Sequence, residues 1–192
     1  MDQTRILAFA GSLRKDSYNK KLLSIAIAGA TAAGADVTAI DLRDYPLPIY
    51  DGDLEAESGL PANALALKRL FIAAEGLLIA SPEYNSSITA VFKNTIDWVS
   101  RPVPGEASLA AFDGKIVTLM AASPGVLGGL RGLVHVRAIL GNINAIVLPG
   151  QVTVSKAHEA FTPEGQLKDA RQQANVEKLG ATLAATIAKL KG

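Results

Sequence analysis

Two polar loops hold the side chains of this chain that are best suited to chemistry. One of them, residues 81–85, reads Ser-Pro-Glu-Tyr-Asn and directly follows the apolar run 76–80. Tyr84 offers a flat face and a hydroxyl, Asn85 an amide and Pro82 a fixed turn, which together suit a planar heteroaromatic ring with polar edges. By itself the pattern also fits an ordinary strand-to-helix loop.

The other loop, residues 11–19, reads Gly-Ser-Leu-Arg-Lys-Asp-Ser-Tyr-Asn and lies between a strand pattern and a helical run. Its side-chain donors and the free N–H groups of a helix start predict a cradle for a single phosphate. The loop lacks the second glycine of G-x-G-x-x-G and the lysine of a P-loop, so a dinucleotide or a nucleoside triphosphate fits it poorly. Ser17 could also cap the helix, which is compatible with this role. The predicted phosphate donors are Ser12, Arg14, Ser17 and Asn19.

Composition excludes several classes of function. The formal net charge of +1 gives no support for nucleic-acid binding, and the absence of cysteine removes disulfides, thiol catalysis and iron–sulfur ligation. No apolar run reaches the roughly 18 residues of a membrane span, and the amino terminus lacks the pattern of a signal peptide. We therefore expect a soluble cytoplasmic protein with one domain over residues 1–192.

Strand-like and helix-like patterns alternate along the chain, which predicts an α/β fold with helices on both faces of a parallel sheet. The expected strands lie near 5–10, 36–41, 76–80, 115–121 and 144–148, and the expected helices near 18–33, 61–75, 88–100, 129–141 and 166–190. Residues 42–50 are too rich in proline for regular structure. Five strands of this kind favour the doubly wound, flavodoxin-like order 2-1-3-4-5.

In that strand order the first and third strands are neighbours, so the two polar loops should converge on one crevice. A third loop, residues 123–129, follows the fourth strand and should border the same crevice. Its glycines would let the backbone approach a ligand closely, although the segment alone reads as a turn.

Five segments of the chain resemble the NAD(P)H-dependent FMN reductases of flavodoxin-like fold, a family that includes bacterial chromate and quinone reductases. The segments are 11–19, 47–55, 81–88, 92–101 and 123–132. One departure is that many relatives have Pro-Gly where this chain has Thr89-Ala90, which affects the geometry at the start of the helix. The resemblance implies that FMN places its phosphate on Ser12, Arg14, Ser17 and Asn19, and its ring against Pro82, Glu83, Tyr84 and Asn85, with Ser123, Gly125 and Gly128 of the third loop closing another side.

The same resemblance implies an oxidoreductase that passes hydride from NADH or NADPH to flavin N5 and then to a quinone, or to a chromate, azo or nitro acceptor. Because one crevice must serve both substrates, we expect ping-pong turnover. No side chain needs to act as nucleophile or metal ligand, and His135 and His158 read as structural or solvated. Two alternatives are a flavodoxin-type electron carrier, which the nearly neutral charge disfavours, and a flavin-dependent redox sensor.

The apolar residues of the third predicted helix exceed what one sheet-facing stripe needs. With the apolar residues of the 45–50 segment they would form an exposed patch, and we expect a homodimer or homotetramer to bury it. The alternative is that the patch packs against the terminal helix. Arg101 could pair with Glu83 within or across subunits. The patch residues are Ile88, Val91, Phe92, Ile96, Trp98 and Val99, joined by Tyr45, Leu47, Ile49 and Tyr50.

Overall fold

A five-stranded parallel sheet forms the centre of the molecule, in a computed structural model that describes residues 3–192. The strand order is β2-β1-β3-β4-β5, which confirms the predicted order. Every residue of β3 and β4 is buried, as expected for central parallel strands covered on both faces. The strands are β1 (Arg5–Ala10), β2 (Asp36–Ile40), β3 (Gly76–Ala80), β4 (Ile116–Ala122) and β5 (Ile146–Val154).

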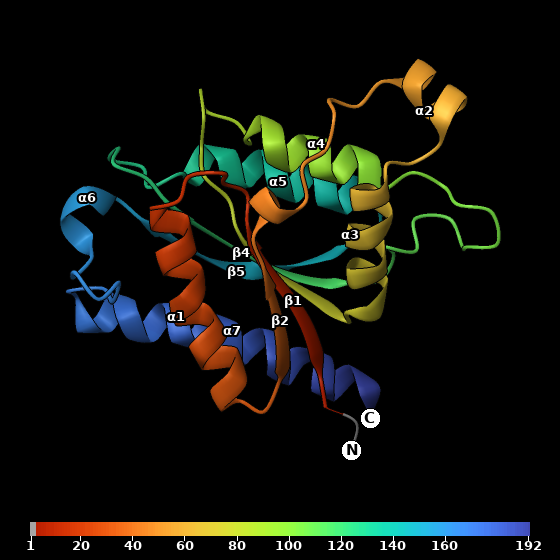
Figure 1. The fold of residues 1–192 in the computed structure, drawn as a ribbon. Coiled ribbons are helices and arrows are strands. Elements are labelled where there is room, and N and C mark those ends of the chain that lie inside the picture. The colour runs from red at the N-terminus through yellow and green to blue at the C-terminus, as the bar shows by residue number, and fades with distance from the viewer. Residues whose placement is uncertain (1–2) are drawn as a thin grey trace.

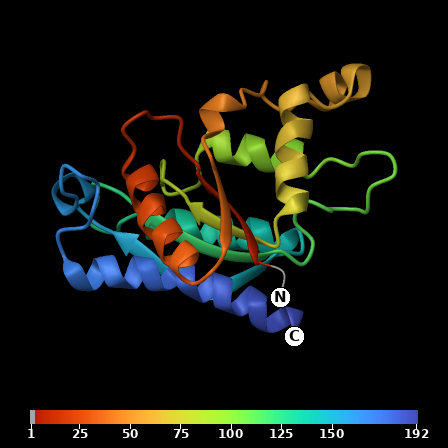
Figure 2. The same ribbon diagram turned by 60° about the horizontal axis from the view of Figure 1, so that its bottom comes forward.

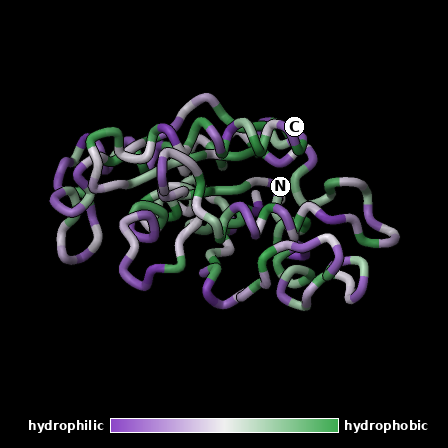
Figure 3. Tube along the Cα trace, turned by 90° about the horizontal axis from the view of Figure 1, so that it is seen from above, coloured by the Kyte–Doolittle hydropathy of each residue, from purple (hydrophilic) through white to green (hydrophobic). Residues whose placement is uncertain are grey.

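Helices cover both faces of this sheet (Figure 1). One face carries α1 (Tyr18–Ala32) and α7 (Ala170–Lys191), and the other carries α3 (Ala62–Ala73), α4 (Ala90–Val99) and α5 (Leu130–Asn142). Figure 2 shows the same two layers from another side. Each layer has its own apolar core against the sheet. In Figure 3 hydrophobic stretches run through the interior of the trace, and hydrophilic stretches are concentrated in the outer loops.

Helices α1 and α7 pack against each other backbone to backbone. Gly29 of α1 and Gly180 of α7 are both buried. A Cβ atom at Gly29 would overlap the carbonyl of Glu177, and one at Gly180 would overlap the carbonyl of Ala26. Two glycines therefore allow a helix contact closer than any side chain would permit.

Three short helical segments lie in the connections between these elements: η1 (Leu42–Asp44), α2 (Gly52–Ser58) and α6 (Ala157–Ala160). The sequence predicted none of them. Helix α2 buries no residue, so it has no apolar stripe that a periodicity could detect.

Strand β5 is longer than predicted, because the expected strand near 144–148 continues to Val154. Pro149 and Gly150 indicate a strand end, but they lie in an edge strand at a register shift, where both residues are tolerated. The guanidinium of Arg137 donates to the carbonyl of Leu148 at 2.8 Å and holds the irregular segment in place.

The prediction of an apolar patch on α4 is largely wrong, because the 45–50 segment lies over this helix. The carbonyl of Pro48 accepts from Trp98 Nε1 and from Asn94 Nδ2, each at 2.8 Å. The rings of Tyr50 and Trp98 meet edge to face with their centroids 5.1 Å apart. The apolar residues of α4 that do not face the sheet are therefore covered by the 45–50 segment, not left exposed and not packed against the terminal helix. The buried apolar residues of α4 are Phe92, Ile96, Trp98 and Val99.

Candidate functional site

The loops that follow β1 and β3 meet at the carboxyl edge of the sheet. The N–H of Gly11 donates to the carbonyl of Ala80 at 2.9 Å, and Thr89 Oγ1 donates to the carbonyl of Gly11 at 2.7 Å. A cavity of about 350 Å³ lies between the two loops. The predicted convergence of the loops is therefore observed. The cavity is lined by Gly11, Ser12, Leu13, Arg14, Tyr84, Thr89, Ala90 and Val91.

Helix α1 begins a few residues after the part of the first loop that lines this cavity. Ser17 occupies the N-cap position and is buried, but its side chain makes no capping hydrogen bond. The first N–H groups of the helix have no partner inside the helix, and the helix dipole gives this end a partial positive charge. Ser12 is buried with its Oγ accepting from the N–H of Arg14 at 3.2 Å, and the Arg14 side chain is exposed. Buried hydroxyls, free amides and a guanidinium thus gather where an anion would be stabilised.

The sequence suggested that the side chain of Asn19 donates a hydrogen bond to a phosphate, but its amide is already hydrogen-bonded within the chain. Its Nδ2 donates to the carbonyl of Ala122 at 2.8 Å, and its Oδ1 accepts from the N–H of the same residue at 2.9 Å. The amide therefore joins α1 to the end of β4 and is buried there. Asn19 fixes the helix that carries the cradle, and a direct contact with phosphate stays a prediction.

Tyr84 projects from a tight hairpin. Its backbone N–H and carbonyl both bond to Ser87 at 3.0 Å. The two residues between them, Asn85 and Ser86, have φ angles of 50° and 66°, the left-handed conformation that a type I′ turn requires. Tyr84 is 52% exposed and lines the cavity, while Pro82 is buried.

Glu83 is directed away from the cavity toward the amino end of α5. Its Oε2 accepts from the backbone N–H of Gly132 at 2.9 Å, and its Oε1 accepts from Arg131 at 3.2 Å. Gly129 is the N-cap residue of α5, and no side-chain cap comes from that position. Glu83 therefore supplies the missing cap from a distant loop. The ring contact that the resemblance implies for Glu83 stays a prediction.

The suggested pair of Glu83 with Arg101 does not form within the described part of the chain. Arg101 Nε instead pairs with Glu55 at 3.0 Å. His135, which the sequence indicated as structural or solvated, is exposed on α5 and its Nδ1 lies 2.8 Å from Ser87 Oγ. Sequence reasoning did not identify Arg131 and His135 as neighbours of the Tyr84 hairpin.

The third loop lies at the same edge of the sheet but outside the cavity. Ser123 Oγ accepts from the N–H of Gly125 at 3.2 Å, and the N–H of Ser123 donates to the carbonyl of Val154 at 3.0 Å. A Cβ atom at Gly128 would lie 2.9 Å from the backbone of Ser155. The missing side chain of Gly128 thus serves packing against the end of β5.

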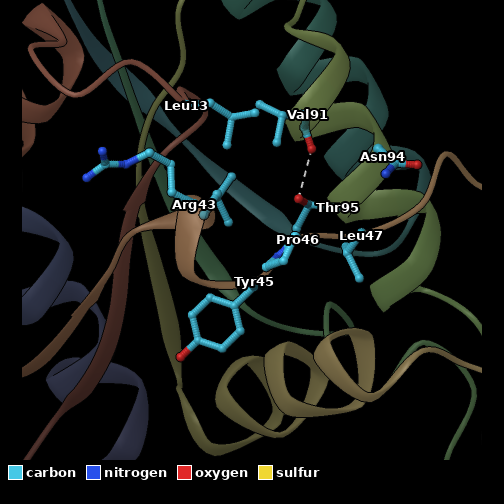
Figure 4. Close-up of a pocket in the computed structure, with 9 residues that line it drawn as sticks. Leu13, Arg43, Tyr45, Pro46, Leu47, Val91, Asn94 and Thr95 are labelled. Atoms are coloured by element: carbon cyan, nitrogen blue, oxygen red, sulfur yellow. Dashed lines mark hydrogen bonds between the residues drawn. The ribbon is translucent and has the colours of Figure 1, made fainter.

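A second cavity of about 270 Å³ adjoins the first and shares Leu13 and Val91 with it. Figure 4 shows these two side chains pointing toward each other, with Tyr45 at the opposite end. The further lining residues are Leu42, Arg43, Pro46, Leu47, Asn94 and Thr95. This cavity could not be predicted from the sequence, because residues 42–47 carry no regular pattern.

A charge cluster at Asp41 fixes the rim of the second cavity. Arg43 donates to Asp41 Oδ2 at 2.9 Å and Lys20 donates to the same oxygen at 2.6 Å. Burial alone would raise the pKa of Asp41, but the hydrogen bonds from Arg43 and Lys20 outweigh it and lower the pKa to about 2. Asp41 thus pairs with both cations, and its single negative charge offsets one of their two positive charges.

Two absences concern the described residues only. Within residues 3–192, no three His, Cys, Asp or Glu side chains are grouped as a metal ion would require. No helix in the same range is both long and apolar enough to cross a bilayer.

Comparisons with known proteins agree with one another. The family model described as NADPH-dependent FMN reductase matches residues 4–159. The chain is 34% identical to an NAD(P)H-dependent FMN reductase of Pseudomonas aeruginosa, over 100% of this chain and 99% of that protein. It is 36% identical to a quinone reductase of Escherichia coli over 148 residues, which are 77% of this chain and 74% of that protein. A solved structure, the flavoenzyme NAD(P)H:(acceptor) oxidoreductase of Paracoccus denitrificans, matches with a TM-score of 0.78 and 26% identity over 97% and 98% of the two chains.

Proposed function

Because this chain belongs to the NADPH-dependent FMN reductase family, we propose that it binds FMN and reduces quinones at the expense of NADPH or NADH. The observation that carries this proposal is the cavity in which Ser12 and Arg14 of one loop meet Tyr84 of the other. Bound FMN would supply the hydride-transfer chemistry. The chain would supply binding, orientation and electrostatics, and no side chain needs to act as nucleophile.

The residues present fit the phosphate of FMN. Ser17 sits at the N-cap of α1 without using its hydroxyl for capping, so that hydroxyl and the adjacent N–H groups can meet an anion. Arg14 adds a charge-assisted hydrogen bond, and Ser12 a buried hydroxyl. A single phosphate monoester would use all of these hydrogen-bond donors. The adenylate of FAD would need space beyond them.

The residues present also fit a flavin ring. Tyr84 offers an exposed aromatic face, and Asn85 an amide beside it. We assign ring contacts to Pro82, Tyr84 and Asn85. Asn19, Glu83 and the 123–129 loop hold the elements around the cofactor, Asn19 and Glu83 through the hydrogen bonds described above.

Bound FMN would occupy the cavity between the two loops, so the nicotinamide and the acceptor would both have to reach the one ring face that stays exposed. This supports ping-pong turnover, in which the oxidised nicotinamide leaves before the acceptor binds. A face of this kind would also be open to chromate, azo compounds and nitro compounds, which we propose as further acceptors.

The test is direct. The purified protein should bind one FMN, be bleached by NADPH or NADH without oxygen, and oxidise the nicotinamide steadily once a quinone is added. Steady turnover without a partner reductase would separate an enzyme from a flavodoxin-type carrier. Failure to bind FMN, or binding without nicotinamide oxidation, would contradict the proposal.

We further propose that the chain is a homodimer or homotetramer. Since α4 is covered within the chain, support comes from the side chains that stay exposed around the two cavities. Ile49 is 87% exposed and Leu13 51% exposed, and both line a third cavity that also includes Val91. A symmetric interface would bury such residues. Light scattering at micromolar concentration tests this, and a 20.0 kDa species that retains FMN would contradict it.

A further inference from the structure

Glu83 links two elements that the sequence places far apart. It follows the end of β3, and only 10% of its side chain is exposed. Both carboxylate oxygens are used, one by the N–H of Gly132 and one by Arg131. Gly132 is the third residue of α5, where an N–H has no partner inside the helix and a negative charge is favoured.

The hairpin after Glu83 lies directly on the first turns of α5. A Cβ atom at Gly132 would be 3.1 Å from the carbonyl oxygen of Ser87 and 3.2 Å from the Cβ of Glu83. His135, one turn further along α5, contacts Ser87 Oγ at 2.8 Å. The residues on both sides of the hairpin tip, 83 and 87, are therefore attached to the same helix.

Tyr84 itself has little support apart from this attachment. Half of the residue is exposed, and its backbone groups bond only across the turn to Ser87. Asn85 and Ser86 both adopt positive φ, which is unfavourable for residues other than glycine unless the surroundings enforce it. The direction of the Tyr84 ring thus depends on how firmly the hairpin is held.

We propose that Glu83 is a positioning residue: by capping α5 it holds the hairpin that directs Tyr84 into the cavity, and it affects the flavin reaction only through Tyr84. Both carboxylate oxygens of Glu83 are engaged by α5, so it is not assigned a contact with the reacting atoms. This inference rests on the proposed function for its kinetic consequence. Its structural consequence can be measured without cofactor.

The first experiment uses the full chain free of FMN. Hydrogen exchange is measured by NMR at the Tyr84 and Ser87 amides, which close the hairpin. In Glu83→Ala these two amides should exchange at least about tenfold faster, while the amides of β3 keep their protection. Glu57→Ala, which alters an exposed glutamate on α2, is the matched control and should change neither set. Unchanged protection at Tyr84 and Ser87 in Glu83→Ala would overturn the proposal.

The second experiment is a double-mutant cycle on the FMN-loaded protein, read as the rate constant of flavin reduction by NADPH. Glu83→Ala should lower that rate constant about tenfold when Tyr84 is present and less than about twofold in a Tyr84→Ala background. Glu83→Gln keeps an acceptor for the Gly132 N–H, so its loss should be smaller than that of Glu83→Ala. An equal loss in both backgrounds would show that Glu83 acts independently of Tyr84 and would overturn the proposal.

If Glu83→Ala does not fold, the same cycle is run with Glu83→Gln, and the loss must again depend on Tyr84. A wild-type protein that binds FMN and turns over, but shows no coupling between the two residues, would overturn this inference alone. A wild-type protein without FMN binding or NADPH oxidation would overturn the proposed function, and the kinetic part of this inference with it.

Discussion

The hydroxyl of Thr89 donates to the carbonyl of Gly11 at 2.7 Å, across 78 positions of the sequence. The same oxygen accepts from the N–H of Phe92 at 3.3 Å and so caps α4. One buried hydroxyl therefore joins the two loops of the site and begins a helix. Thr89-Ala90 is also the position at which a departure from the resemblance was noted in the sequence. Thr89 gives this position a side-chain hydrogen bond to the first loop, which a proline could not make.

Replacing Thr89 by valine should destabilise the protein. Valine keeps the shape but removes the hydroxyl, which leaves the carbonyl of Gly11 without this donor and α4 without its cap. We expect a loss of about 1–3 kcal/mol in the free energy of unfolding, measured with urea, and a much smaller loss for Thr89→Ser. Thr182→Val on the exposed side of α7 serves as control. A Thr89→Val protein as stable as wild type would refute this role.

Arg14→Ala should weaken FMN binding without affecting riboflavin. The substitution removes a charge-assisted hydrogen bond to the phosphate, which is worth about 1.5–3 kcal/mol. This corresponds to roughly ten- to hundredfold in Kd, measured by quenching of flavin fluorescence. Riboflavin has no phosphate, so its affinity should not change, and neither should that of Lys15→Ala for FMN. Equal affinities of the wild type for FMN and riboflavin would argue against the phosphate cradle.

The Asp41 cluster predicts a pH-dependent contribution to stability. The pKa of Asp41 is lowered from 3.8 to about 2, so its stabilising effect is present above about pH 4 and is lost as the pH falls toward 2. Its side chain is 23% exposed, and we therefore expect Asp41→Asn to cost only about 1–2 kcal/mol at pH 7. The difference between variant and wild type should shrink from pH 4 downward in urea titrations. A constant difference between pH 7 and pH 3 would show that the charge is not responsible.

Steady-state kinetics should give parallel lines in double-reciprocal plots when NADPH and a quinone are varied together. Parallel lines follow if both substrates use the one exposed ring face in turn. High quinone concentrations should inhibit competitively with NADPH for the same reason. Intersecting lines, together with a ternary complex detected directly, would require a separate acceptor site.

The sequence predicted the central part of the fold well because burial there is complete. The bounds of β1 and β3 agree with the structure, since strands covered on both faces appear as unbroken apolar runs. The continuation of β5 past Pro149 was missed because an edge strand tolerates residues that would end a central one. The covering of Trp98 was missed because an irregular segment makes that contact.

For the site, the sequence predicted which loops meet but not how their side chains are used. The strand order alone brings residues 11–19 and 81–85 to the same edge of the sheet. The hydrogen-bond partners of Asn19 and Glu83 lie 103 and 49 positions away in the sequence. No local sequence pattern indicates which partner a side chain will find at that separation. Both side chains form hydrogen bonds that hold together the elements around the cavity.

The close approach of Gly29 to the backbone of Glu177, and of Gly180 to that of Ala26, joins α1 and α7 along their backbones. We expect α1 to tilt or slide only together with the carboxyl-terminal helix, because no side chain separates the two backbones at these glycines. The two helices should therefore open together as a single cooperative segment rather than fray separately. The amino end of α1 would thus be held from a point several turns away, and residues that never touch the proposed phosphate would set the geometry offered to it.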